Sequence, residues 1–127
     1  MNDDRRRNTI LELGRIREPL HATGFGLGAL LAGVHLWLGT ETGLTTFYVV
    51  GAVYVAGLAV YLTTYWRPVG YLVAIVHTLA LGVVWLLGGR AFFDVGVATG
   101  VLALSFVVVS GYLFAADSGL TAAAHGP

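Results

Sequence analysis

Four long stretches of the chain contain no charged side chain, and they constrain the fold more than any other feature. They cover residues 19–38, 46–65, 69–88 and 95–116 of the 127-residue sequence. About 20 residues at a helical rise of 1.5 Å cross the ~30 Å hydrocarbon layer of a bilayer. The runs are continuously apolar rather than alternating, which favours helices over the strands of a membrane barrel. We therefore predict an all-α fold, an integral membrane up-down four-helix bundle over residues 19–116.

The connections between these stretches are short, so consecutive helices should be antiparallel neighbours. In that topology six of the seven arginines fall on one side of the membrane: Arg5, Arg6, Arg7, Arg15, Arg17 and Arg67. Only Arg90 falls on the other side. Because arginine-rich loops stay in the cytoplasm, we predict a multi-pass protein of the cell membrane with both termini cytoplasmic.

The composition agrees with a lipid-facing surface. Hydrophobic residues make up 57% of the chain and charged residues only 11%, against about a quarter in soluble domains. The absence of cysteine excludes disulfides and thiolate chemistry. The three tryptophans are expected in the interfacial belts, Trp66 on the inner side and Trp37 and Trp85 on the outer side.

The two ends of the chain are expected to lie outside the bundle. Residues 1–18 form a basic N-terminal segment in which Thr9 and Glu12 have the spacing of a capping box. We predict a short interfacial helix there, with its arginines toward anionic headgroups; a disordered basic tail is the alternative. Residues 117–127 are predicted to form a flexible C-terminal tail, with His125 solvated.

Two histidines, His21 and His35, lie fourteen residues apart in the first apolar stretch. On a helix this spacing leaves them about 40° apart on one face and about 21 Å apart along the axis. Gly24, Gly28 and Ala32 lie between them on that face. The pattern resembles membrane cytochromes of the b type, which place two histidines at such a spacing on one helix, one for each of two haems. The resemblance implies that both histidines are candidate haem b ligands.

His77 is the remaining histidine of the apolar stretches and the third candidate haem ligand. Its expected depth lies between those of His21 and His35, and a bis-histidine site needs partners at equal depth. The sequence LHATG at residues 20–24, with His77 downstream, also resembles the membrane anchor of succinate dehydrogenase. Ala22 stands where that family has arginine, and residues 46–65 form an additional span. The resemblance implies a quinone site with haem b, whereas our main expectation is that no cofactor is bound.

Small residues offer a structural interpretation of the same helix. Gly24 with Gly28, and Ala29 with Gly33, form small-xxx-small patterns that let helices approach closely. The candidate helix-packing residues are Gly24, Gly28, Ala32, Gly33, Gly96 and Gly100. We expect His21 to be satisfied by water and headgroups at the inner boundary. His35 has few polar neighbours in sequence and should take its partner from another helix or a ligand, so we expect it to matter more.

Tyr54 and Tyr61 are the candidate buried polar residues of the second stretch, and buried hydroxyls need hydrogen-bond partners. His77 is a possible partner because the next stretch is an antiparallel neighbour. Threonines such as Thr78 are expected to bond only to their own helix. No carboxylate lies deep in any stretch, which argues against a proton-coupled transporter. Nucleophile sets and phosphate loops are absent, and nothing beyond the N-terminal arginines suggests nucleic-acid binding.

The heptapeptide at residues 33–39, GVHLWLG, resembles the end of the first span in uncharacterised small four-span membrane proteins of halophilic archaea. The layout is similar over roughly residues 20 to 115, and the resemblance implies the fold and the habitat but no activity. We predict a non-enzymatic membrane protein that associates with itself, as a homo-oligomer, or with another membrane protein. The alternatives are a haem b-binding electron-transfer or quinone-site subunit and a small ion channel or transporter.

Overall fold

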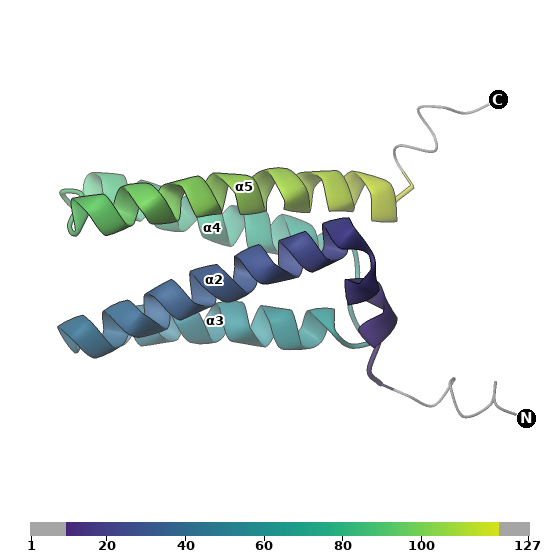
Figure 1. Ribbon diagram of the computed structural model, residues 1–127. Helices are drawn as coiled ribbons and strands as arrows, with labels where there is room; N and C mark the ends of the chain where they lie inside the picture. Colours follow the sequence, from purple (N-terminus) through teal and green to yellow (C-terminus); the bar gives the residue numbers. More distant parts are fainter. Residues whose placement is uncertain (1–9, 120–127) are drawn as a thin grey trace, which may run out of the picture.

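The computed structural model describes residues 10–119, and this part of the chain is helical without a β-strand. A short 3₁₀ helix precedes four long helices: η1 (Leu13–Arg17), α2 (Pro19–Thr42), α3 (Thr45–Tyr61), α4 (Val69–Leu87) and α5 (Phe93–Asp117) (Figure 1). The all-α prediction with four long helices is confirmed. Helices α2, α4 and α5 are long and apolar enough to cross a membrane, whereas α3, with 17 residues, is shorter.

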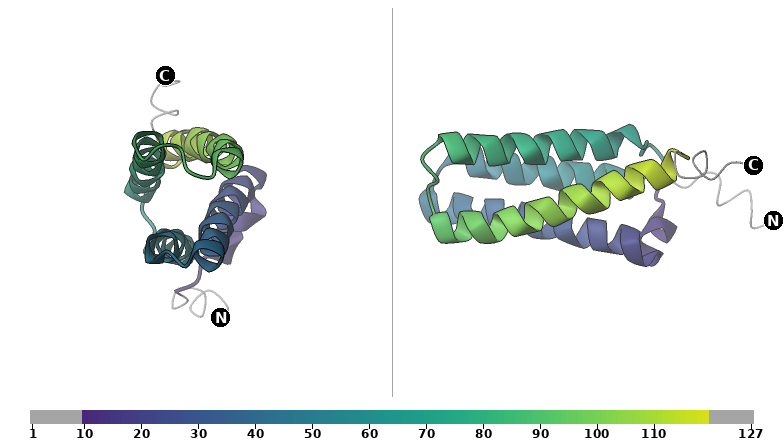
Figure 2. Two further views of the ribbon diagram at one scale, coloured as in Figure 1. Left: turned by 90° about the vertical axis from the view of Figure 1, so that its left-hand side faces the viewer. Right: turned by 90° about the horizontal axis from the view of Figure 1, so that it is seen from above.

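The four helices alternate in direction and occupy the corners of a bundle (Figures 1 and 2). Helix α2 packs closely against α3 and α5, and α4 packs closely against α5. Helices α3 and α4 are consecutive in the chain, yet they make the fewest contacts of any adjacent pair. The bundle is therefore closed on three sides and loosely packed on the side between α3 and α4.

Local chemistry explains where α2 begins and ends. Pro19 occupies its first turn, where a missing N–H costs nothing. Gly43 follows the helix with a φ of 69°, and its N–H donates to the carbonyl of Gly39 at 2.9 Å. This left-handed glycine cap ends the helix four residues beyond the predicted limit of residue 38.

Helix α3 ends at Tyr61, four residues before the predicted limit of residue 65, because the N-terminal segment binds its end. Leu11 and Thr63 form an isolated antiparallel bridge. The N–H of Glu12 donates to the carbonyl of Leu62, and the N–H of Thr64 donates to the carbonyl of Ile10, both at 2.7 Å. These bonds satisfy backbone groups that would otherwise continue the helix.

The N-terminal segment differs from the predicted interfacial helix. Thr9 of the proposed capping box lies outside the described residues, and residues 10–12 are extended before η1 begins. Arg15 was expected to face headgroups, but its guanidinium donates to the backbone carbonyls of Tyr61 and Thr63 and lies 5.2 Å from the centre of the Tyr61 ring. At the other end of the chain the tail was predicted over residues 117–127, but Asp117 is still helical, and residues 120–127 lie outside the described part.

Two clusters of buried side chains form the interior. The central cluster contains Leu31, Ala32, Val50, Tyr54 and Phe106. The second cluster lies toward the end of the bundle that carries η1 and contains Tyr61, Tyr71 and Leu113. Aromatic rings thus occupy both levels of the core, and the gap between them on the α3–α4 side is the site described next.

Candidate functional site

A cavity of about 390 Å³ lies between α3 and α4, within the usual size range for small-molecule sites. Its floor is formed by α2 and α5, which contribute Gly24, Phe106 and Leu113 among others. Several of its lining residues are small: Ala56 and Gly57 on α3, and Gly70 and Ala74 on α4. No Asp, Glu, Lys or Arg side chain is among its lining residues, so its walls are apolar apart from a few hydroxyl and ring N–H groups.

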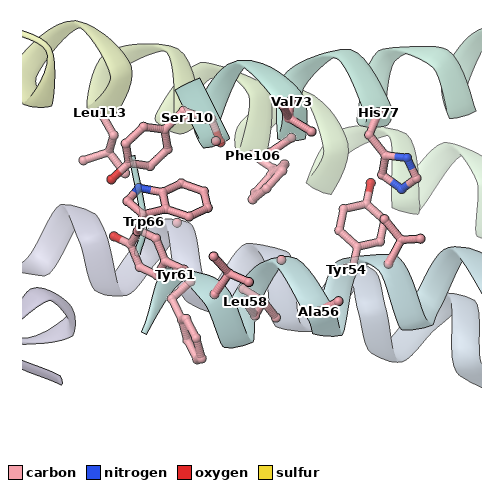
Figure 3. A pocket seen from close by; sticks show the side chains of 18 residues that line it. Tyr54, Ala56, Leu58, Tyr61, Trp66, Val73, His77, Phe106, Ser110 and Leu113 are labelled. Atoms are coloured by element: carbon pink, nitrogen blue, oxygen red, sulfur yellow. The ribbon is translucent and has the colours of Figure 1, made fainter. Parts of the chain in front are cut away.

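One end of the cavity is formed by Tyr61 and Trp66 (Figure 3), and Tyr71, which also lines the cavity, completes an aromatic cluster with them. The ring of Trp66 lies edge-on to both tyrosines, with centroids 5.0 Å away in each case. The Nε1 atom of Trp66 is buried and has no hydrogen-bond partner among the described residues, and the buried hydroxyl of Tyr61 lies close to that of Tyr71. Trp66 was predicted to be an interfacial anchor, but its indole N–H is buried against the core.

The opposite end of the cavity is formed by Tyr54 and His77 (Figure 3). The hydroxyl of Tyr54 shares a hydrogen bond with Oγ1 of Thr78 at 2.8 Å. The ring of His77 lies edge-on to Tyr54 at 5.0 Å, and its Nε2 atom is buried without a partner in the described structure. Tyr54 and His77 are therefore neighbours, as predicted. The hydroxyl of Tyr54, however, bonds to Thr78, whose side chain was expected to bond only to the backbone of its own helix.

His21 lies behind the aromatic cluster, in a polar network at the same end of the bundle. It is buried, with 8% of its surface exposed, and its ring stacks on Tyr61 at 6.4 Å. Its Nε2 atom lies 3.2 Å from Oδ2 of Asp117, and its Nδ1 atom lies 2.9 Å from Oε2 of Glu18. The hydroxyl of Tyr71 donates a hydrogen bond to the same Asp117 oxygen at 2.7 Å. The expectation that water and headgroups satisfy His21 is wrong for Nε2, whose partner is Asp117, whereas Nδ1 makes no hydrogen bond despite its proximity to Glu18.

His35 lies far from that network, and its observed hydrogen-bond partner also differs from the expected one. Its Nδ1 atom lies 2.7 Å from the carbonyl of Leu31, one turn earlier in its own helix, in a hydrogen bond. Its ring lies 5.7 Å from that of Tyr54 and 6.4 Å from that of Phe47. The prediction of a partner from another helix or a ligand is therefore wrong for Nδ1, although two aromatic rings of α3 lie beside the imidazole.

These contacts do not fit a bis-histidine haem within one chain. Tyr54 contacts both His35 and His77, so its ring takes part of the space where a macrocycle would have to lie. Both ring nitrogens of His21 face carboxylate oxygens rather than open space. Within residues 10–119, no group of three His, Asp or Glu side chains is arranged to hold a metal ion.

The predicted packing residues divide into two sets. A Cβ at Gly24 would lie 3.2 Å from Val109, and one at Gly28 would lie 3.0 Å from Leu58 and 3.3 Å from Phe106. Ala32 is buried, and a side chain at Gly96 would collide with the indole of Trp85. By contrast, a Cβ at Gly33 or Gly100 would meet nothing within 4 Å. Neither Gly33 nor Gly100 is needed for packing within the chain.

Three residues of this region are not recognisable as site residues from the sequence: Trp66, Thr78 and Asp117. The spacing of small residues in α3 and α4 was visible, but small residues on neighbouring helices usually indicate close packing rather than a cavity. Asp117 was assigned to the tail because it follows the last apolar run. Its position within reach of two buried side chains depends on how the ends of α2, α4 and α5 converge.

The chain matches no protein-family model, and neither a curated protein nor a solved structure is similar to it.

Proposed function

We propose that the chain is a multi-pass protein of the cell membrane that acts, without catalysis, by associating with a second membrane-embedded copy. Its exposed surface supports membrane insertion. Leu87, Val108 and Val76 expose 83%, 71% and 67% of their surfaces, and many other large apolar residues are exposed along α3, α4 and α5. An apolar surface of this extent is unfavourable in water and favourable in lipid.

The arrangement of charges supports an orientation with both termini in the cytoplasm. Arg15, Arg17 and Arg67 belong to the end of the bundle that carries η1 and the α3–α4 loop, and Arg90 belongs to the opposite end (Figure 1). Because cytoplasmic loops are enriched in arginine, the first end should be inside. Alkaline phosphatase fused after Pro127 should be inactive and a fluorescent protein fused there should be bright. The reverse pattern would refute this orientation.

The outer face of α2 carries the association proposal. Ala22, Gly26, Ala29 and Gly33 follow one another at intervals of four, three and four residues, which places them on one side of the helix. Ala22, Ala29 and Gly33 are exposed, and a Cβ at Gly26 or Gly33 would meet nothing within 4 Å. A flat face of small residues allows a second helix to approach closely and gain van der Waals contact.

Gly33→Leu tests this face, with Ala98→Leu on an exposed position of α5 as the matched control. Energy transfer between labelled copies in vesicles would measure the dissociation constant of the assembly. We expect Gly33→Leu to raise it at least fivefold, about 1 kcal/mol, and Ala98→Leu to leave it unchanged. Equal effects of the two variants would show that the α2 face meets lipid. A monomeric wild-type protein would refute self-association and favour another membrane protein as the partner.

A further inference from the structure

We propose that the cavity between α3 and α4 holds one hydrocarbon tail of an anionic phospholipid, whose phosphate is bound by Arg67 at one end of the cavity. The inference rests on the membrane insertion proposed above. It depends neither on self-association nor on which end of the bundle faces the cytoplasm. It starts from a space of about 390 Å³ that the side chains of the described residues leave open.

The walls of the cavity require an apolar occupant. Water fills a cavity only where it finds two to four polar partners per molecule, and cavities with apolar walls stay dry. The hydroxyl of Tyr54 is already bonded to Thr78, and the unpaired ring nitrogens of Trp66 and His77 have almost no accessible surface. An apolar cavity of about 150 Å³ accepts benzene. The larger cavity therefore has room for several carbons of a tail, whose dispersion contacts would replace those that an empty space lacks.

The mouth of the cavity lies between α3 and α4. Val53, Gly57 and Val60 on α3 and Val73 on α4 line the cavity and are also exposed. These two helices are the least tightly packed neighbours in the bundle. In a bilayer the mouth would face hydrocarbon tails, which are the most concentrated apolar groups there. A lipid tail can therefore enter sideways between the two helices without crossing a polar surface.

The cavity is elongated in the direction of the helices, as a tail in a bilayer is. Tyr61 and Trp66 form one end, and Tyr54 and His77 form the other (Figure 3). The two ends are about 10 Å apart, as judged from the seven-residue spacing of Tyr54 and Tyr61 on α3. Phe106 is among the apolar side chains that line the space between them. A tail can thus lie along the helices, and its head must leave the cavity at one of the two ends.

Arg67 determines at which end the head lies. It belongs to the loop between α3 and α4, directly after Trp66 and three residues before Gly70, and both of these residues line the cavity. Arg67 is exposed, and its Nη1 atom donates to the carbonyls of Thr64 and Trp66 at 3.2 Å in each case. Its Nε and Nη2 atoms make no hydrogen bond within residues 10–119. These remaining N–H groups can donate to a phosphate.

The charge pattern favours an anionic lipid over a neutral one. Arginines beside membrane helices attract anionic lipid heads, and the head would lie at the loop while the tail follows the cavity. The opposite end of the cavity offers no such cation. Tyr54 and His77 lie in the middle of their helices, and no arginine or lysine lies within two turns of either residue along the chain.

Quenching of Trp66 fluorescence by brominated lipids tests both parts of the proposal, because bromine quenches tryptophan only at short range. Trp37→Phe and Trp85→Phe leave Trp66 as the only tryptophan. The protein is reconstituted into phosphatidylcholine vesicles that contain the same mole fraction of brominated phosphatidylglycerol or of brominated phosphatidylcholine. Flotation of carbonate-washed vesicles checks insertion, and circular dichroism checks the fold. A protein that fails to insert would refute the proposed function, and this result is recognised before any lipid preference is measured.

The binding of the head is tested by the preference between the two lipids. We expect phosphatidylglycerol to bind beside Trp66 about fivefold more tightly than phosphatidylcholine, the effect of one arginine at a membrane surface. Arg67→Gln should abolish this preference. Arg17→Gln is the matched control, because Arg17 is exposed in η1 at the same end of the bundle, and it should retain the preference.

The binding of the tail is tested by filling the cavity. A Cβ at Gly57 would meet nothing within 4 Å, so Gly57→Leu adds a side chain at the mouth without a clash. A Cβ at Gly82 also meets nothing within 4 Å, but Gly82 does not line the cavity, so Gly82→Leu is the matched control. We expect Gly57→Leu to reduce the quenching of Trp66 about twofold or more, because the tail and the new side chain cannot share one space. Gly82→Leu should leave the quenching unchanged.

The proposal is overturned if the inserted, folded protein shows no preference for phosphatidylglycerol or if Arg67→Gln retains the preference. It is also overturned if Gly57→Leu is quenched as strongly as Gly82→Leu. If neither brominated lipid quenches Trp66, the proposal is wrong as well, and a second copy seated on the mouth becomes the better explanation.

Discussion

Replacing Asp117 by alanine should destabilise the bundle more than any other exchange of a charged residue. Its Oδ2 atom accepts a hydrogen bond from Tyr71 on α4 and lies within bonding distance of His21 on α2. The carboxylate therefore joins three helices at one end of the bundle. Without it, the hydroxyl of Tyr71, a residue only 4% exposed, and the buried ring of His21 both lose their partner.

The magnitude follows from these two bonds. A hydrogen bond to a charged group contributes about 1.5 to 3 kcal/mol, so two bonds at the lower limit give about 3 kcal/mol. The Asp117 side chain is 29% exposed, and water that reaches the site would reduce the loss to about 2 kcal/mol. Unfolding in mixed micelles with increasing sodium dodecyl sulfate, followed by circular dichroism, measures this free energy.

Asp94→Ala is the matched control, because Asp94 is exposed in the first turn of α5 and makes no side-chain bond within residues 10–119. A double-mutant cycle with Tyr71→Phe should give a coupling of about 1 kcal/mol between Tyr71 and Asp117. The reasoning fails if Asp117→Ala costs no more than Asp94→Ala. It also fails if the two changes in the cycle are additive within ~0.3 kcal/mol.

Further predictions use the same unfolding assay. His21→Ala should lower the free energy of unfolding by about 2 kcal/mol and His35→Ala by about 1 kcal/mol, because only His21 is bonded to a carboxylate of another helix. A larger loss for His35→Ala would support the expectation from the sequence that His35 matters more. Gly28→Leu should lower the free energy of unfolding by about 2 kcal/mol, because the new side chain overpacks against Leu58 and Phe106. Gly33→Leu should leave the stability of the monomer unchanged. Equal effects of the two variants would contradict the inward position of Gly28. Arg15→Met should cost about 1 kcal/mol and speed amide exchange at Leu62 and Thr64, whereas Arg17→Met, at an exposed position, should change neither. Unchanged exchange in Arg15→Met would show that Arg15 does not hold the end of α3.

The four helices could be predicted because each depends on a local pattern. Long apolar runs separated by short polar or glycine-containing connections determine where helices lie, and Pro19 and Gly43 mark the limits of α2 by their own backbone preferences. The inward position of Gly24 and Gly28 also followed from spacing along a single helix.

The site could not be predicted because it depends on how separate helices meet. Trp66 has the sequence context of an interfacial residue, and only the turn after α3 brings its indole against Tyr61 and Tyr71. His21 looks solvated until the end of α5 places Asp117 beside it. The cavity arises from loose packing between α3 and α4, which composition does not reveal, since the same small residues also occur where helices touch.

The unequal lengths of the helices have a mechanical consequence in a bilayer. Helix α3 has 17 residues and α5 has 25, so at 1.5 Å per residue they measure about 26 and 38 Å. They occupy opposite corners of the bundle (Figure 2). In the proposed membrane orientation, lipid beside α3 would meet a shorter apolar wall than lipid beside α5, and the bundle would match a bilayer of uniform thickness by tilting along this diagonal or by thinning the membrane next to α3. Because the mouth of the cavity borders α3, it would open into the thinned region, where acyl chains are most disturbed.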